Sequence, residues 1–288
     1  MVLSQARSVD QSLTLWRKPR RLLAECTRTR LTLTGKDLSI VRFGQILTFS
    51  SNIDHVTKGH LHQHIQAFFA HVYPCQANGF IHRGTLLRNL QSERVTRKVL
   101  LAICAVTSRF IDGAVSSMSA RVQAEAWAKE AKSLLVLEDM TTDTVVAALL
   151  LARHDINSGN YSSAWMLSSI ATRAALALGL NKDATVDDGS LSFTEQETRR
   201  RLFWACYCLD RMMSTGLPEL VVLRTEHVHL QLPCEEQQYL LDIPCATRIN
   251  NLETEISCTQ ENPSSAQANV GMSGHYVQIM QMRYSILK

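Results

Sequence analysis

Histidines gather between residues 55 and 82, and two of them have a spacing that could bind a metal ion. His60 and His64 are four residues apart, so on a helix they would share one face. A protein zinc site needs three or four converging ligands, and no acidic residue follows this pair closely. We therefore interpret both histidines as part of a polar stripe, solvent-facing or partly buried, rather than as metal ligands.

The cysteines and the recognised catalytic motifs offer no stronger candidate. The eight cysteines are scattered without a Cys-x-x-Cys pair, which favours free thiols over a zinc module or a disulfide framework. Asp187 and Asp188 precede Gly189-Ser190, a pattern typical of a turn rather than of a magnesium site. No phosphate-binding loop, nucleophile elbow or His-Glu-x-x-His motif occurs, although a triad built from distant residues would not be visible in a sequence. We predict no catalytic, cofactor or metal site, and we expect that the protein is not an enzyme.

In residues 158–218, charged residues occur within predicted helices that are otherwise largely apolar. They could form a solvated helix face, or they could form a partly buried ionic network between neighbouring helices. We give the two interpretations equal weight, and the network would specify register more than add stability. Its candidate members are Arg173, Glu195, Glu197, Arg200, Arg201, Asp210 and Arg211.

Two predicted helices would position these charges. The first spans residues 160–178 and has many alanines, which permit close approach of another helix, and Gly179 suits a left-handed C-terminal cap. The second spans residues 195–214, and two overlapping capping boxes, Ser192-x-x-Glu195 and Thr194-x-x-Glu197, are possible at its start.

Hydrophobic periodicity predicts further helices on both sides of this pair. Apolar residues recur at helical spacing in the ranges 57–73, 93–111, 118–137, 141–154 and 276–287, and residues 75–85 read as a loop. The range 141–154 is apolar around most of its circumference, which indicates a buried helix. The sequence therefore predicts an all-α fold, a multi-helix array of antiparallel helical hairpins.

Composition divides the chain into four segments. Residues 1–55 are a basic, irregular linker, residues 56–245 a helical domain, residues 246–273 a polar linker that we expect to be disordered, and residues 274–288 the start of a further, truncated helix. The net charge of +4 is too weak to indicate nucleic-acid binding. We see no signal peptide or membrane span and expect a soluble, intracellular protein.

Ordered motifs over residues 56–240 resemble the middle homology region of fungal-specific transcription factors. The similarity lies in Gly159, Ala164-Trp165, Leu178-Gly179-Leu180 and the run Glu195-x-Glu197-x-Arg199-Arg200-Arg201-Leu202-Phe203-Trp204, followed by Asp210-Arg211, Gly216-x-Pro218 and Leu232-Pro233. Two positions depart from the family pattern, because Leu217 replaces its frequent arginine and Asn181 its frequent histidine.

The resemblance implies a regulatory domain of a nuclear protein that controls RNA polymerase II transcription. Such proteins usually bind DNA through an N-terminal zinc cluster of six cysteines, and this sequence lacks that cluster, so we expect no cofactor in the chain and zinc only in an absent cluster. The implied partners are DNA through such a cluster, the transcription machinery or regulatory proteins, a small-molecule effector and a second copy of the chain, but no membrane. The alternative is a cluster-less helical module for protein interaction or effector sensing without DNA binding.

Overall fold

The computed structural model describes residues 58–75, 77–111, 118–183, 191–225, 228–249 and 269–287. Predictions that fall on residues 1–57, 184–190 or 250–268, including the basic linker, the Asp187-Asp188 turn and most of the polar linker, lie outside the described residues. The boundaries of the four predicted segments stay predictions.

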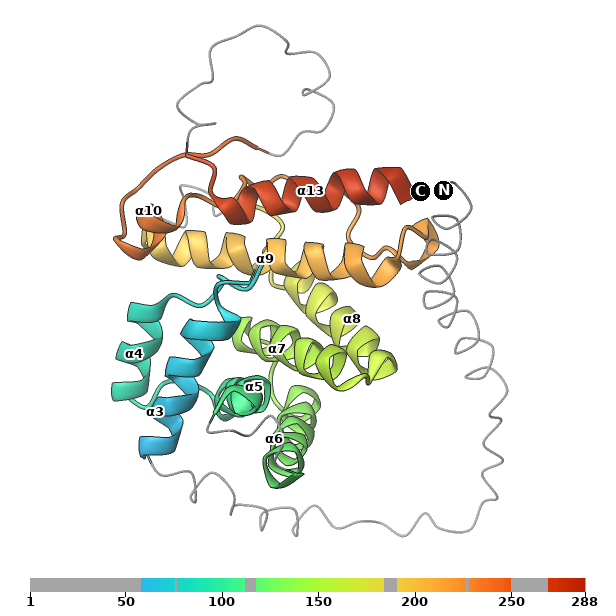
Figure 1. Cartoon of the computed structure of the whole chain (residues 1–288). Helices are drawn as coiled ribbons and strands as arrows, with labels where there is room; N and C mark the ends of the chain where they lie inside the picture. The colour runs from blue at the N-terminus through green and yellow to red at the C-terminus, as the bar shows by residue number, and fades with distance from the viewer. Residues whose placement is uncertain are drawn as a thin grey trace, which may run out of the picture. The chain divides into compact units, whose positions relative to one another are not determined.

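The described part is all-α, as the periodicity predicts, and it contains isolated β-bridges but no strand (Figure 1). The α-helices are α3 (Lys58–Ala67), α4 (Arg83–Gln91), α5 (Arg97–Thr107), α6 (Met118–Leu137), α7 (Thr142–Ser158), α8 (Tyr161–Ala177), α9 (Phe193–Ser214), α10 (Glu236–Leu240) and α13 (Met272–Leu287). A π-helical turn, Phe68–Val72, continues α3, and short 3₁₀ turns occupy Ser108–Phe110 and Pro218–Leu220.

Successive helices pack against one another, and α5 to α9 form the core. Helix α5 contacts both α6 and α7, α7 pairs with α8, and α8 leans on α9. Residues 145–152 of α7 are all buried, because this helix has apolar neighbours on every side. On α8 the alanines Ala164, Ala171 and Ala175 are fully buried, so small side chains bring its backbone close to its neighbours.

Helix ends follow the signals in the sequence in most places. Gly159 ends α7 in the left-handed conformation at φ +80°, and Gly179 follows α8 at φ +65°. The prediction of a loop over residues 75–85 is wrong at its end, because α4 begins at Arg83. Its N-cap is His82, whose ring accepts a hydrogen bond from the Thr85 N–H. Histidine is not among the usual capping residues, so this start was not recognised.

Helix α13 runs alongside α9 (Figure 1). The glycines at its start fit closely on the segment before α10: the Gly271 N–H donates to the Pro233 carbonyl, and an added Cβ at Gly274 would meet that same carbonyl oxygen at 2.9 Å. Glycine is needed at these positions because the two backbones approach each other directly.

His64 of α3 is buried rather than on a solvent-facing stripe. Its Nδ1 atom lies 2.8 Å from the Thr107 Oγ1 atom of α5, and its ring meets Trp127 of α6 edge-on, with 5.2 Å between the ring centroids. Burial, assisted by the nearby His60, lowers the pKa of His64 to about 4. The imidazole is therefore neutral at physiological pH and links α3, α5 and α6.

We predict that acid weakens the fold through His64. The unfolded chain takes up a proton near pH 6.5 and the folded chain only near pH 4, so stability is complete above pH 6.5 and falls as the pH drops from 6.5 to 4. The expected loss is about 2–4 kcal/mol, measured as the free energy of urea unfolding. His64→Gln should flatten this dependence, whereas His62→Gln, at an exposed position on the same helix, should not. An unchanged pH profile for His64→Gln would contradict the assignment.

Candidate functional site

Helix α9 carries most of the ionised side chains singled out in the sequence, and its start is fixed by one capping box. The Ser192 side chain accepts from the Glu195 N–H at 3.3 Å, and the Glu195 carboxylate accepts from the Ser192 N–H at 2.8 Å. The overlapping second box does not form, because Thr194 donates instead to the Asp242 carboxylate. Glu195 is thus an exposed capping residue and lies apart from the other charges.

Two residues further on, Glu197 is fully buried, and its carboxylate lies at the centre of a charge cluster. It accepts from Arg200 Nη1 at 2.6 Å, from Arg201 Nε at 2.9 Å and from the backbone N–H of Cys234 at 2.9 Å. One carboxylate therefore pairs with two arginines of its own helix and also holds the segment before α10.

Arg201 reaches furthest from α9. Its guanidinium donates to the Gly79 carbonyl at 3.2 Å, to the Cys234 carbonyl at 2.9 Å and to the Glu236 carboxylate at 2.5 Å, and it stacks over the Tyr239 ring at 4.0 Å. Tyr73 donates a further hydrogen bond to Glu236. The guanidinium group suits this arrangement, because its N–H donors lie in one plane and point in different directions, so one side chain can reach several acceptors.

Arg200 closes the other side of the cluster. It donates to the Asp183 carboxylate from Nη2 at 2.8 Å, and Asp183 in turn accepts from the Gln231 N–H at 3.0 Å. We use the name Glu197 cluster for Asp183, Glu197, Arg200, Arg201 and Glu236. Its hydrogen bonds connect α9 to distant parts of the chain: Asp183 lies 17 positions from Arg200, and Gly79 lies 122 positions from Arg201.

A second charged pair lies near the end of α9. Asp210 accepts from the N–H groups of Val222 and Leu223 and lies 3.2 Å from Arg211 Nη1. Arg211 donates to the Leu223 carbonyl at 2.6 Å and stacks over Tyr284 of α13 at 4.6 Å. The pair, which we call the Asp210 pair, fixes the chain after α9 and touches α13.

The electrostatics follow from burial and from these partners. Burial alone would lower the pKa of Arg201, but the Glu197 and Glu236 carboxylates raise it above its ordinary value. Arg200 behaves in the same way beside Glu197 and Asp183. Burial raises the pKa of Asp210, and the two N–H donors and Arg211 offset part of that rise. Both arginines of the Glu197 cluster therefore stay charged in the core.

The structure brings together some of the seven predicted network residues and separates others. Glu197, Arg200 and Arg201 share one cluster, Asp210 and Arg211 form their own pair, Glu195 caps the helix, and Arg173 is exposed on α8. Sequence reasoning missed Asp183 and Glu236. No local signal marks either residue, because each meets α9 only after the chain has folded.

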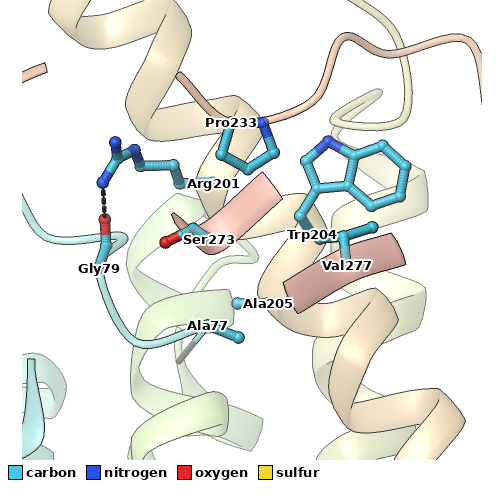
Figure 2. Close-up of a pocket in the computed structure, with 8 residues that line it drawn as sticks. All are labelled: Ala77, Gly79, Arg201, Trp204, Ala205, Pro233, Ser273 and Val277. Atoms are coloured by element: carbon cyan, nitrogen blue, oxygen red, sulfur yellow. Dashed lines mark hydrogen bonds between the residues drawn. The ribbon is translucent and has the colours of Figure 1, made fainter. Parts of the chain in front are cut away.

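A small cavity adjoins the Glu197 cluster where α9, α13 and the Gly79 loop meet (Figure 2). Its volume is about 10 Å³, which is room for about one water molecule. The side chains of Arg201, Ser273 and Trp204 line it. An open groove of about 440 Å³ lies on the other side of the cluster, beside Arg200, Gln231 and Cys245.

Within the described ranges, no three His, Cys, Asp or Glu side chains are arranged to hold a metal ion. The cysteines there are free thiols. None of the helices described is both long enough and apolar enough to cross a lipid bilayer. The contacts described above make up two buried ionic sites, the Glu197 cluster and the Asp210 pair, and both hold loops on α9.

We predict that Glu197→Gln destabilises the fold strongly. Two buried arginines would lose their shared carboxylate, and breaking a buried ion pair costs about 3–5 kcal/mol. Glu195→Gln is the matched control on the same helix, with an expected change of roughly 0.5 kcal/mol or less because glutamine also serves in a capping box. The measurement is the free energy of urea unfolding. Equal effects for the two variants would show that the Glu197 cluster contributes no special stability.

Arg211→Ala should also destabilise the protein, by about 2–4 kcal/mol, because it leaves Asp210 buried without its cation. Arg173→Ala, which removes an exposed arginine from α8, should change the thermal midpoint little. A negligible shift for both Arg211→Ala and Arg201→Ala would rule out a structural ionic network.

Comparisons with known proteins agree with the resemblance seen in the motifs. The family model described as "Fungal specific transcription factor domain" matches residues 65–274. The Zn(2)-C6 fungal-type transcription factor FTF1c of Fusarium oxysporum f. sp. lycopersici is 28% identical over 193 residues, which cover 63% of this chain and 21% of that protein. An uncharacterised transcriptional regulatory protein of Schizosaccharomyces pombe is 29% identical over 232 residues, covering 76% of this chain and 24% of that protein.

The chain thus spans about a fifth to a quarter of the length of these curated relatives, which are transcription factors and regulators rather than enzymes. No solved structure gives a significant match. The family match covers α4 to α10 and so includes both ionic contacts of α9. The chain therefore belongs to the fungal specific transcription factor domain family.

Proposed function

We propose that this chain acts in the nucleus as the part of a transcription factor that adjusts RNA polymerase II transcription by contacting regulatory proteins or a small effector. The observation that carries the proposal is the family match across residues 65–274. The relatives' printed names describe transcription factors and a transcriptional regulatory protein, and this supports the same process for the present chain.

The Glu197 cluster supports a regulatory rather than a catalytic role. Its carboxylates are engaged by arginines and backbone N–H groups, so they are not poised to exchange protons with a substrate. What the cluster does is hold the Gly79 loop, Asp183 and the segment around Cys234 on one helix. A partner or ligand that displaced one of these segments would act on all of them through α9.

We propose that residues 1–288 do not themselves recognise a DNA sequence. The relatives' name includes a Zn(2)-C6 cluster, but this sequence has no Cys-x-x-Cys pair. The described cysteines do not fit a zinc cluster either, because Cys104, Cys206 and Cys208 are buried in helices and burial raises their thiol pKa values. Zinc therefore has no part in the function proposed for these residues.

We predict that the chain changes transcription when it is tethered to DNA by another protein's DNA-binding domain. In a fungal reporter strain, the fusion carrying residues 1–288 should alter reporter output relative to the DNA-binding domain alone. Glu197→Gln should abolish the effect and Glu195→Gln should retain it, with immunoblots confirming equal amounts of the fusions. Reporter output that matches the DNA-binding domain alone would contradict the proposal.

We also predict that the purified chain does not select a DNA sequence. Electrophoretic mobility shifts against a pool of random duplexes should recover no enriched motif at physiological salt, because the net charge of +4 supports at most weak, unspecific binding. Recovery of one motif would place DNA recognition within residues 1–288 and overturn that part of the proposal.

A further inference from the structure

Two cysteines meet beside the Glu197 cluster, where residues 244–249 lie against the segment before α10. The two segments run antiparallel, and the Leu232 N–H donates to the Arg248 carbonyl at 3.0 Å. Two residues after Leu232, Cys234 therefore faces the beginning of the second segment, which contains Cys245. The fold brings these two thiols together, although no Cys-x-x-Cys motif marks them in the sequence.

The two thiols contact each other but differ in their access to solvent. Burial raises the pKa of the Cys245 thiol, and a hydrogen bond shared with the Cys234 thiol offsets part of that rise. Cys234 is buried, whereas Cys245 is partly exposed and lines the open groove beside Arg200. A dissolved reagent therefore reaches Cys245 first, and the second sulfur available to complete a reaction there is that of Cys234.

The other cysteines of the described ranges are less suited to a reversible reaction. Cys206 and Cys208 are buried in α9 two positions apart, so their side chains point to nearly opposite sides of the helix. Cys104 is buried within α5. Only the Cys234–Cys245 contact, among the cysteines described, combines a thiol that solvent reaches with a second thiol beside it.

We propose that Cys234 and Cys245 form a reversible disulfide when the protein meets hydrogen peroxide. The Cys245 thiolate attacks one peroxide oxygen, so that an S–O bond forms, the O–O bond breaks and the second oxygen leaves with a proton as water. The Cys234 thiol then loses its proton and attacks the sulfur of this sulfenic acid, which forms the S–S bond and releases a second water. Two electrons pass from the thiols to the peroxide, and exchange with a small dithiol returns them.

The reaction is slow but the product is well placed. Burial raises the pKa of both thiols, so little thiolate is present at neutral pH and a brief exposure to peroxide oxidises few molecules. The thiols already touch, so the bond forms with little movement of the backbone. The pair therefore responds to sustained oxidation, in keeping with the transient disulfides of reducing compartments.

The disulfide closes a loop that carries α10 and part of the Glu197 cluster. Glu236 of this loop accepts from Arg201 at 2.5 Å. The backbone of Cys234 donates to Glu197 at 2.9 Å and accepts from Arg201 at 2.9 Å. Oxidation thus adds a covalent clamp to a segment that is otherwise held on α9 by hydrogen bonds and ion pairs. This device is independent of the proposed role in transcription.

The first test is peptide mapping of the full chain after exposure to hydrogen peroxide, with the remaining thiols blocked by N-ethylmaleimide. Cleavage after Glu235 and Glu236 separates the two cysteines, so a linked pair of peptides identifies the disulfide. We expect this linked pair as the main product and expect dithiothreitol to remove it. Cys245→Ser should abolish it, whereas Cys75→Ser, which removes an exposed thiol outside the pair, should leave it unchanged.

A second measurement compares the thermal midpoints of the oxidised and reduced chains. The midpoint should rise by about 5 °C on oxidation, because the link restricts the unfolded chain, and it should fall back with dithiothreitol. Cys245→Ser should show no such rise. In Cys234→Ser the sulfenic acid has no neighbouring thiol, and dimedone, a reagent for sulfenic acids, should label Cys245.

The proposal is overturned if N-ethylmaleimide still labels Cys234 and Cys245 after prolonged peroxide treatment, or if Cys245 becomes linked to a different cysteine. An oxidised chain that carries the link but melts at the reduced chain's midpoint overturns the clamp. The circular dichroism spectrum of Cys245→Ser, a change at a partly exposed position, verifies that this variant is folded. These outcomes leave the reporter prediction untouched.

Discussion

Two arginines of α9 are buried in the core, and the structure must supply carboxylates that neutralise them. Arg200 and Arg201 are buried about two turns from the start of the helix, and a buried guanidinium without a partner costs several kcal/mol. Glu197 supplies a charge from the same helix, but one carboxylate cannot balance two arginines. Asp183 and Glu236 supply the rest, which requires the chain to bring two distant segments to α9. Charge compensation therefore helps to place these loops, together with the burial of apolar side chains such as Phe80 and Leu232.

The remaining helices give α9 a rigid support. Helix α7 is buried on all sides, and the alanines of α8 bring it close to its neighbours, so the core beneath α9 is densely packed. Loops would otherwise be the mobile part of such an array, yet here they are held at both ends of α9, by the Glu197 cluster at one end and by the Asp210 pair at the other.

The sequence predicted the elements better than their contacts. The helices from α6 to α9 were predicted within a few residues, because long apolar stripes and the caps at Gly159, Gly179 and Ser192 are local signals. Helix α4 was missed because a histidine caps it. The partners of Arg200 and Arg201 could not have been predicted, since helix periodicity says nothing about which distant carboxylate will fold against a given arginine. The exposed Arg173 and the buried Arg211 looked alike in the sequence for the same reason.

The Glu197 cluster also limits how the gene can change. Any single replacement among Glu197, Arg200 and Arg201 removes a counterion that the remaining residues share, so the effects of substitutions at these positions are strongly non-additive. Lysine is no simple substitute at Arg201, because an ammonium group cannot serve Gly79, Cys234 and Glu236 from one plane. An apolar replacement of the whole cluster could be equally stable, but the path to it passes through variants that fold poorly. We therefore expect the cluster to be retained during evolution, because replacing it one residue at a time passes through destabilised variants, whatever the complete cluster contributes to stability.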